Sequence, residues 1–496
     1  MSTYNPPILE QLALEALLRN DAIDFFDLEN LPTMLFPPLF IEAFKSRRTE
    51  ILKAMVASWP FFYLPVGPLL KTADVEMMQV VLDGIDILMN QNVCPRRKLQ
   101  VLDLRRDVHQ DFWNAWAGRE DGMCSPDILT KKQGPESLPT YALTHRLQVV
   151  TNLILFRSLE EDQKCLLQWA QKSSDSLQLV CLKMKIFCSP LEIIKEVLNI
   201  FQPIYIEELE IHIPEVLSFL GFFTHFLGQM RNITKFNLHQ ILFQYNNPLD
   251  VYRENTKDMI DLKKCSAIFF SQFSKLKHLQ SLYLNGAHVS YDNMKVLYRC
   301  LRTPLQSLSI SFCQLSTSDL KHMTKCQSLY QLKKLHFNNV VFSKSGSKIL
   351  KILLEYVSET LKNLQFEHCR MKDSQLKDLL PALSQCSQLN FINFYYNDFS
   401  FDVLIDLLQC TANLSNLTVE VYSAPNECYD PLGNVSMDRF SELCSELVEI
   451  LLPKRLPKEI MFATPTCPHC WGCCIYVLQD KIEGTNACRC WELIED

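Results

Sequence analysis

Glycine is scarce in this sequence, with 12 residues in 496. Neither a GxGxxG nor a P-loop pattern occurs, which argues against a phosphate-binding loop. Neither sign of charge dominates, because the sequence has 49 Lys and Arg and 56 Asp and Glu, a net charge of -7. This balance gives no electrostatic reason to expect nucleic acid as a partner. No nucleophile–base constellation stands out either, so we expect a protein that is not an enzyme.

A long hydrophobic run is missing as well. The most apolar stretch, residues 213–230, contains Glu215 and His225 and is too mixed for a membrane span. The first residues lack the basic segment and apolar core of a secretory signal. We therefore expect no membrane association and a cytoplasmic location, with the nucleus as an open alternative. In that setting the 20 cysteines should be reduced thiols or metal ligands.

A recurring pattern, Leu-x-x-Leu-x-Leu, dominates what is present. Six clear copies, 25 to 29 residues apart, start at Leu279, Leu305, Leu332, Leu361, Leu389 and Leu414. Looser copies start at Val150, Leu179, Ile206 and Ile233, with an earlier outlier at Leu99. Eight residues after three of the starts come Cys313, Cys369 and Asn397. This is the leucine-rich-repeat pattern, in which a short strand is followed by a helix.

The repeats predict an α/β fold, a leucine-rich-repeat solenoid of the horseshoe, ribonuclease-inhibitor-like kind. One strand–helix unit cannot bury its own apolar face, so the units must stack. A small polar side chain or thiol after each strand can bond backbone groups at the turn. Ser or Asp near the start of the following segments indicates helix N-caps. The spacing also predicts an insertion of about 20 residues between the copies at Ile233 and Leu279, around residues 243–258.

Residues 1–98 contain no clear repeat and predict an N-terminal helical cap, before a solenoid over 99–455 and a Cys-rich tail over 456–496. One helical stripe in the cap contains Leu9, Leu12, Ala13 and Leu17. Its simplest interpretation is a cover for the open end of the solenoid. The alternative is a helix that docks in a groove of a partner.

Several blocks resemble the PRAME (preferentially expressed antigen of melanoma) family over nearly the whole chain. They are LPTMLFPPLFIEAFKSRRTEILKAMVASWPF (31–61), VLDGIDILM (81–89), RRKLQVLDLRRDVHQDFWNAW (96–116), SQCSQLNFINFYYNDFS (384–400) and CPHC (467–470). The resemblance implies a substrate receptor of a cullin-RING ubiquitin ligase, with elongin B/C, a cullin and a RING protein as partners.

That resemblance also implies two docking segments. Leu9, Ala13 and Leu17, with Leu12 on the same stripe, match the short helix that docks on elongin C. Leu31, Pro32, Met34 and Leu35 match the apolar-Pro segment that contacts the cullin. The substrate, an unknown protein, is expected on the concave strand face.

Residues between the inward leucines supply that face. The candidate substrate-binding residues are Tyr283, Asn285, His336, Phe391, Asn393 and Tyr395, since exposed aromatics suit binding anchors. The same strand positions hold Lys183, Lys185, Glu208, Glu210 and His212 upstream of these candidates, and Gln365 and Glu367 between His336 and Phe391.

The tail is dense in cysteine. Cys467, Cys470, Cys488 and Cys490 have a spacing that would allow four thiolates around a structural zinc ion. The alternative is unpaired reduced thiols in a capping hairpin. No other cofactor is expected.

Two further functions stay open. The chain would act without a ligase if the horseshoe simply wrapped one partner as a scaffold or inhibitor. Transcriptional corepression would use Leu-x-x-Leu-Leu strings such as the one at 350–354. Core-facing repeat helices are the favoured explanation of these strings, because the periodicity already requires leucines there.

Overall fold

The structure is a computed structural model that describes most of the chain in two compact units, residues 1–207 and 208–496. The described residues are 16–18, 28, 30–70, 74–90, 98–106, 113, 146–173, 177–214, 216–240, 256–286, 294–313, 315–431, 433–465, 473–479 and 482–486. The division between the units falls inside the predicted solenoid domain, not at residue 98. Most of the predicted insertion, and the Cys-x-x-Cys of the tail, lie outside the described residues.

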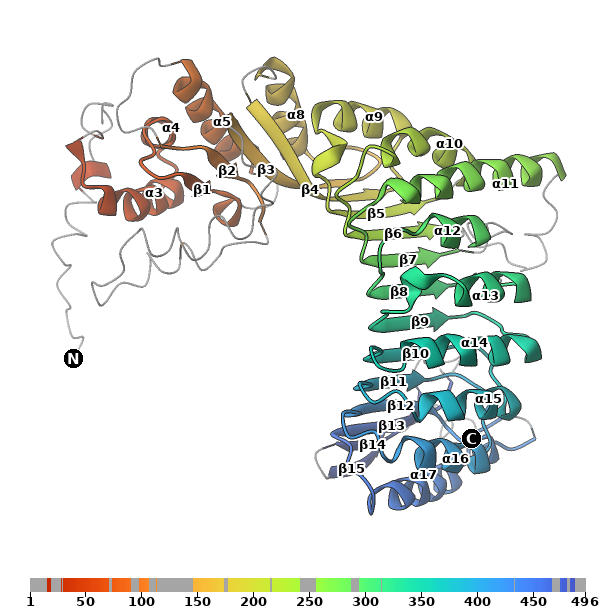
Figure 1. Cartoon of the computed structure of the whole chain (residues 1–496). Helices are drawn as coiled ribbons and strands as arrows, with labels where there is room; N and C mark the ends of the chain where they lie inside the picture. The colour runs from red at the N-terminus through yellow and green to blue at the C-terminus, as the bar shows by residue number, and fades with distance from the viewer. Residues whose placement is uncertain are drawn as a thin grey trace, which may run out of the picture. The chain divides into compact units, whose positions relative to one another are not determined.

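The first unit is a parallel sheet with helices beside it (Figure 1). Its strands follow chain order: β1 (Tyr63–Pro65), β2 (Val101–Asp103), β3 (Leu147–Leu155) and β4 (Leu177–Phe187). Its helices are α3 (Phe36–Lys45), α4 (Thr49–Ala57), α5 (Val75–Asn90), α8 (Glu161–Ser173) and α9 (Leu191–Ile200), with a short 3-10 turn η1 (Thr33–Leu35). Helices α3, α4 and α5 lie within residues 1–98, the range predicted as a cap, and they share one unit with the first strands.

Two buried groups organise the first unit. Aromatic rings pack where α3, α4 and β1 meet, with Phe40 5.2 Å from Trp59 and 5.5 Å from Trp113 between ring centroids. Beside them Asp103 and Arg105 form a buried ion pair at 2.6 Å, and the Tyr63 hydroxyl donates to Asp103 at 2.6 Å. A buried charge needs such partners, because its desolvation is costly.

The second unit repeats a strand–helix module. Strands β5 to β13 are parallel neighbours in chain order, and β14 and β15 add an antiparallel hairpin. The strands are β5 (Glu208–Ile213), β6 (Lys235–Gln240), β7 (Ser281–Asn285), β8 (Ser307–Ser311), β9 (Lys334–Asn338), β10 (Asn363–Glu367), β11 (Phe391–Phe394), β12 (Val419–Ser423), β13 (Glu459–Ala463), β14 (Ile475–Gln479) and β15 (Ile482–Asn486). The helices are α10 (Val216–Leu227), α11 (Thr256–Ser271), α12 (Met294–Cys300), α13 (Thr317–Thr324), α14 (Lys344–Val357), α15 (Asp373–Leu383), α16 (Phe401–Thr411) and α17 (Met437–Leu451).

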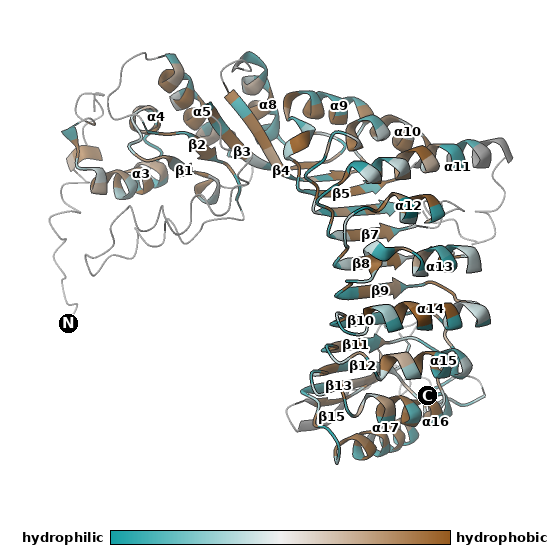
Figure 2. Cartoon of the chain, in the orientation of Figure 1, coloured by the Kyte–Doolittle hydropathy of each residue, from teal (hydrophilic) through white to brown (hydrophobic). Residues whose placement is uncertain are grey.

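The arrangement is α/β and solenoid-like, as predicted. Most of these strands alternate half-buried and buried residues, and the buried ones point to the helices. The helices carry both hydrophobic and hydrophilic residues, as expected when one face lies on a core (Figure 2). We call the side of β5–β13 that faces away from the helices the open face.

The motif leucines lie at equivalent places in the second unit. Leu279, Leu305, Leu332, Leu361 and Leu389 are all buried, each two residues before a strand begins. The next leucine of the motif forms a ladder in register: Leu282 pairs with Leu308, Leu308 with Leu335, and Leu335 with Leu364. The periodicity therefore marks a continuous core between sheet and helices.

The copy predicted at Leu414 is wrong by three residues. Phe391 pairs with Val419 in the parallel register, so the residue equivalent to Leu389 is Leu417. The misplacement arose because Leu414, Leu417 and Val419 fit the spacing of the motif, whereas the true copy has Glu420 at one of its apolar positions. The corrected alignment places Glu420 where other repeats have the second leucine.

Where Cys or Asn follows the strand turn, its side chain behaves as predicted. Cys313 and Cys369 are buried, and their thiols donate to backbone carbonyls, Cys369 to Glu367 at 3.2 Å. Asn397 makes more hydrogen bonds than the two thiols: its side-chain amide donates to the carbonyls of Phe366 and Phe394, both at 2.8 Å. The helix caps agree too, since the Ser316 side chain caps α13 together with Asp319 in a capping box.

The residue just before this Cys or Asn position has a backbone conformation that the sequence did not predict. Phe312, Asn339, His368 and Tyr396 each have φ between 52° and 61°, and Gly286 occupies the same place with φ 124°. At Gly286, Phe312, Asn339 and His368 the backbone amide donates to a carbonyl of the next strand–helix module, as from Phe312 to Asn338 at 2.8 Å. Non-glycine residues rarely adopt this left-handed conformation, and at these positions the hydrogen bond compensates its cost.

No described helix is both long and apolar enough to cross a membrane. The leucines of the 350–354 string are core residues of α14, as the periodicity favoured: Leu350, Leu353 and Leu354 are at most 1% exposed.

Candidate functional site

The open face of the second unit places side chains in straight rows, because neighbouring strands are paired in register. One row runs from β5 to β11 through successive partners. Its members are Glu210, Asn237, Tyr283, Ser309, His336, Gln365 and Asn393. We call it the central row. Three of the predicted substrate-binding residues, Tyr283, His336 and Asn393, thus lie in one line.

The other predicted residues flank this row. Asn285 belongs to a second row with His212, His239, Ser311, Asn338 and Glu367. Phe391 belongs to a row on the opposite side, with Asn363 and Lys334. Tyr395 follows β11 directly. The structure therefore brings all six candidates to one face, spread over strands β7 to β11.

Glu367 is the polar centre of this face. Its carboxylate accepts hydrogen bonds from Asn393 at 2.6 Å and from Asn338 at 3.2 Å. The His336 imidazole lies 3.6 Å from it, and Ser309 lies 3.2 Å from the other ring nitrogen of His336. These contacts hold the side chains in fixed positions, which lowers the entropy lost when a ligand binds.

Aromatic groups lie at the end of this network. The rings of His368 and Tyr396 stack at 4.2 Å, and Tyr395 donates from its hydroxyl to the Thr464 carbonyl at 3.0 Å. Burial, with Cys473 and Tyr396 nearby, raises the pKa of Tyr395 to about 12, and burial lowers the pKa of His368. Both groups are therefore neutral at physiological pH. The face offers hydrogen bonds and ring surfaces, and one carboxylate at its centre.

Comparison with known proteins shows the family of the chain. The model of the PRAME C-terminal domain matches residues 147–488, and that of the PRAME N-terminal domain matches residues 6–113. The chain belongs to the PRAME family. It is 39% identical over 490 residues to human PRAME family member 12, covering 98% of this chain and 99% of the relative. Oogenesin-2 of the mouse is 37% identical over 483 residues, covering 97% and 98%.

The segment predicted to contact a cullin lies in the PRAME N-terminal domain and forms a turn before α3. Met34 is 52% exposed in the 3-10 turn η1, while Leu31 and Leu35 on either side are half-buried. Pro32 precedes the turn and is exposed. Phe36, the next residue, is buried against Trp59. The turn thus presents one large apolar side chain on a fixed base.

The segment predicted to contact elongin is described only at its end. Leu17 is helical and half-buried, whereas Leu9, Leu12 and Ala13 lie outside the described residues. The four proposed zinc ligands Cys467, Cys470, Cys488 and Cys490 lie outside them as well, so the zinc site stays a prediction.

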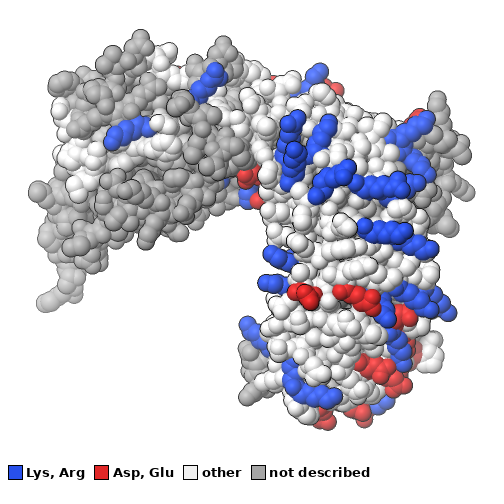
Figure 3. Space-filling view, in the orientation of Figure 1, with Lys and Arg blue, Asp and Glu red and all other residues white. Residues whose placement is uncertain are grey.

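Lys183 and Lys185, also predicted on a strand face, lie in the first unit of this family member. They line a pocket of about 420 Å³ together with Arg105, Arg106, Asp162 and Glu160. Arg106 and Asp162 form an ion pair across this group. Charges of both signs meet there. On the visible face of the second unit, Lys and Arg dominate the upper part, and Asp and Glu appear beside them lower down (Figure 3).

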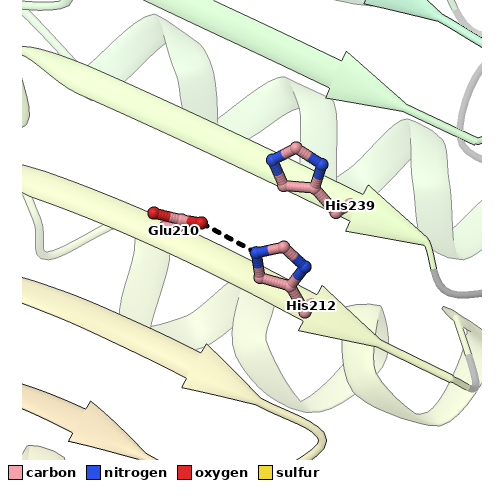
Figure 4. Close-up of side chains that lie close together, drawn as sticks. All are labelled: Glu210, His212 and His239. Carbon is pink, nitrogen blue, oxygen red and sulfur yellow. Dashed lines mark hydrogen bonds and ion pairs between the residues drawn. The ribbon is translucent and has the colours of Figure 1, made fainter.

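One cluster was missed at the start of the open face. His239 on β6 lies beside His212 on β5, their rings stacked at 4.4 Å, and Glu210 accepts from His212 at 2.8 Å (Figure 4). Burial and the neighbouring His212 lower the pKa of His239. Glu210 and His212 were predicted on the strand face, but His239 was not. The spacing contained the signal, because both histidines come six residues after their repeat starts, Ile206 and Ile233.

Proposed function

We propose that this PRAME family member is the substrate receptor of a cullin-RING ubiquitin ligase, and not an enzyme itself. In this proposal the strand–helix units are leucine-rich repeats, and the open face is the concave surface of a horseshoe. A protein substrate binds there, while the N-terminal segment docks on elongin B/C and the cullin. Tethering raises the local concentration of substrate lysines near the charged ubiquitin-conjugating enzyme.

The observation that best supports a receptor is the alignment of Tyr283, His336 and Asn393 in one row of a rigid sheet. Regularly spaced polar and aromatic groups on a fixed scaffold suit an extended protein ligand, because little freedom is lost on binding. Glu367 at the centre favours a substrate segment that presents hydrogen-bond donors or a basic side chain.

The ligase partners are proposed from the family resemblance, and the exposed Met34 supports them. An apolar side chain that is exposed on a fixed turn is a suitable anchor for a groove on a partner. We propose that Leu31, Pro32, Met34 and Leu35 meet the cullin, and that Leu9, Leu12, Ala13 and Leu17 meet elongin C. The cytoplasm is the proposed location.

A pull-down from cells with a blocked proteasome tests the proposal. Wild type should recover elongins B and C, a cullin and candidate substrates. Leu9→Glu/Ala13→Glu should lose the elongins, and Met34→Glu should lose the cullin by about tenfold or more, because each substitution places a charge in an apolar contact.

Val341→Glu is the matched control for Met34→Glu. Val341 is also apolar and 61% exposed, but it lies in the second unit, so its replacement should leave the ligase partners in place. If wild type recovers no elongin from cells that contain it, the receptor proposal fails and a scaffold or inhibitor without a ligase takes its place. The corepressor alternative is weaker, since the leucines at 350, 353 and 354 are buried.

A further inference from the structure

Two histidines and a carboxylate meet on the open face at the boundary of β5 and β6. His212 and His239 are direct register partners, and Glu210 precedes His212 by two residues on the same face. One possible ligand atom from each of the three lies within 4.8 Å of the others. All three are half-buried, with the side chains of His212 and Glu210 20% and 23% exposed, so an ion from solvent can reach them.

A fourth polar group lies beside them. Asn237 is the register partner of Glu210 and stands two residues before His239. Its side-chain oxygen is buried, and no donor within the described part of the chain reaches it. A buried acceptor without a donor is costly, and a nearby cation would relieve this cost.

We propose that Glu210, His212 and His239 bind a divalent transition-metal ion of the zinc type. Imidazole nitrogens favour Zn²⁺ and its neighbours over Mg²⁺ or Ca²⁺, and two His with one carboxylate leave a fourth position open. Water, the Asn237 oxygen or a side chain of a bound protein fits that position. The ion would lie next to Tyr283, the register partner of Asn237, and so at one end of the central row.

Binding requires a defined rearrangement. Ligand atoms about 2.0 Å from a tetrahedral ion are about 3.3 Å apart. The three ligand atoms, which now lie within 4.8 Å of one another, must therefore move closer together. The imidazole planes are now parallel, at 4° to each other. A metal bonds a ring nitrogen in the plane of the ring, so at least one histidine must turn out of the stack. The ion also replaces the hydrogen bond between Glu210 and His212.

Cobalt binding to the full chain tests this inference, which does not depend on the ligase proposal. The chain is stripped with a chelator and titrated with CoCl₂ in a Cys467→Ser/Cys470→Ser background, which removes the predicted thiolate site. We expect one equivalent of Co²⁺ with visible ligand-field bands, no thiolate charge-transfer band, and displacement by Zn²⁺. His212→Ala and His239→Ala should abolish these bands, and Glu210→Gln should weaken binding about tenfold or more.

His225→Ala is the matched control, because His225 is an exposed histidine on α10 of the same unit. It should keep the bands. Thermal unfolding without metal checks that each variant is folded. Zn²⁺ should raise the melting temperature of the parent, which is the Cys467→Ser/Cys470→Ser chain, but not that of His212→Ala. The inference is wrong if the parent shows no such bands, or if Glu210→Gln and folded His212→Ala both bind cobalt as the parent does.

Discussion

Single residues after the strands decide how the backbone turns in the second unit. Asn397, Cys369 and Cys313 occupy one structural position, and each adds a hydrogen bond to backbone carbonyl groups at the turn, such as that of Glu367, which also accepts from the Asn339 amide. The sequence predicted this role because Asn or Cys recurs eight residues after the repeat start. Burial raises the pKa of Cys369 to about 12, so this thiol has a packing role and is unreactive.

Asn397→Ala should therefore destabilise the second unit by about 3 kcal/mol, since it removes the hydrogen bonds to the Phe366 and Phe394 carbonyls and the acceptor of the Met371 amide. Asn397→Cys should cost less, because a thiol serves in the same position at Cys369. The shift of the urea midpoint measures both. Asn390→Ala, at an exposed position next to β11, should change stability by about 0.5 kcal/mol at most. Equal losses for Ala and Cys at position 397 would contradict this role of the side chain.

At the scale of an element, strand β12 shows where the sequence pattern was insufficient. Glu420 takes the place of a core leucine, pairing with Ile392 and Ile460 in the register. It is 0% exposed and lies 2.8 Å from Arg455, which reaches it from the segment after α17 and also donates to the Leu417 carbonyl. A leucine pattern could not locate this strand, because a charge occupies its key position and the partner lies 35 residues away.

Arg455→Ala should consequently be among the most damaging single changes in this unit, by about 3–5 kcal/mol, because it leaves the Glu420 carboxylate buried without a counter-charge. Glu420→Leu/Arg455→Met should recover most of that loss, since it restores the apolar ladder. Unfolding in urea measures both. Lys377→Ala, which breaks an exposed ion pair with Asp406, should cost about 0–1 kcal/mol. A double variant as unstable as Arg455→Ala would show that Arg455 acts through another contact.

At the scale of the whole molecule, the sequence predicted the repeating strand–helix modules but not the two units. Periodicity reveals modules that resemble one another, so β5 to β11 were located by their apolar motif residues. It does not reveal how irregular segments join them. The structure includes β1, β2 and helices α3–α5 in the same unit as β3 and β4, where Val101, Val150 and Val180 pack together with Tyr63. The sequence likewise predicted which residues of each strand lie on the open face. It could not predict the rows, because they depend on the register between strands, which the repeat spacing does not determine.

This organisation predicts the behaviour of a fragment that starts at residue 147, where the match to the PRAME C-terminal domain begins. The cut removes β2 from the edge of β3, and with it the hydrogen bonds from Gln148 to Gln100 and from Leu104 to Val150, both at 2.8 Å. It also removes α5, whose Asp86 accepts from Trp169 at 2.8 Å. An exposed parallel edge with valines at its face is prone to aggregate.

We therefore expect residues 147–496 to aggregate on size-exclusion chromatography, while the full chain elutes as a discrete species. Co-expression with residues 1–146 should restore solubility, because β2 and α5 then cover the edge in trans. A fragment 147–496 that is monomeric and melts cooperatively without residues 1–146 would contradict this. That result would mean that β3 and β4 are stable without β1 and β2, and that the packing of Val150 against Tyr63 and Val101 contributes little to the fold.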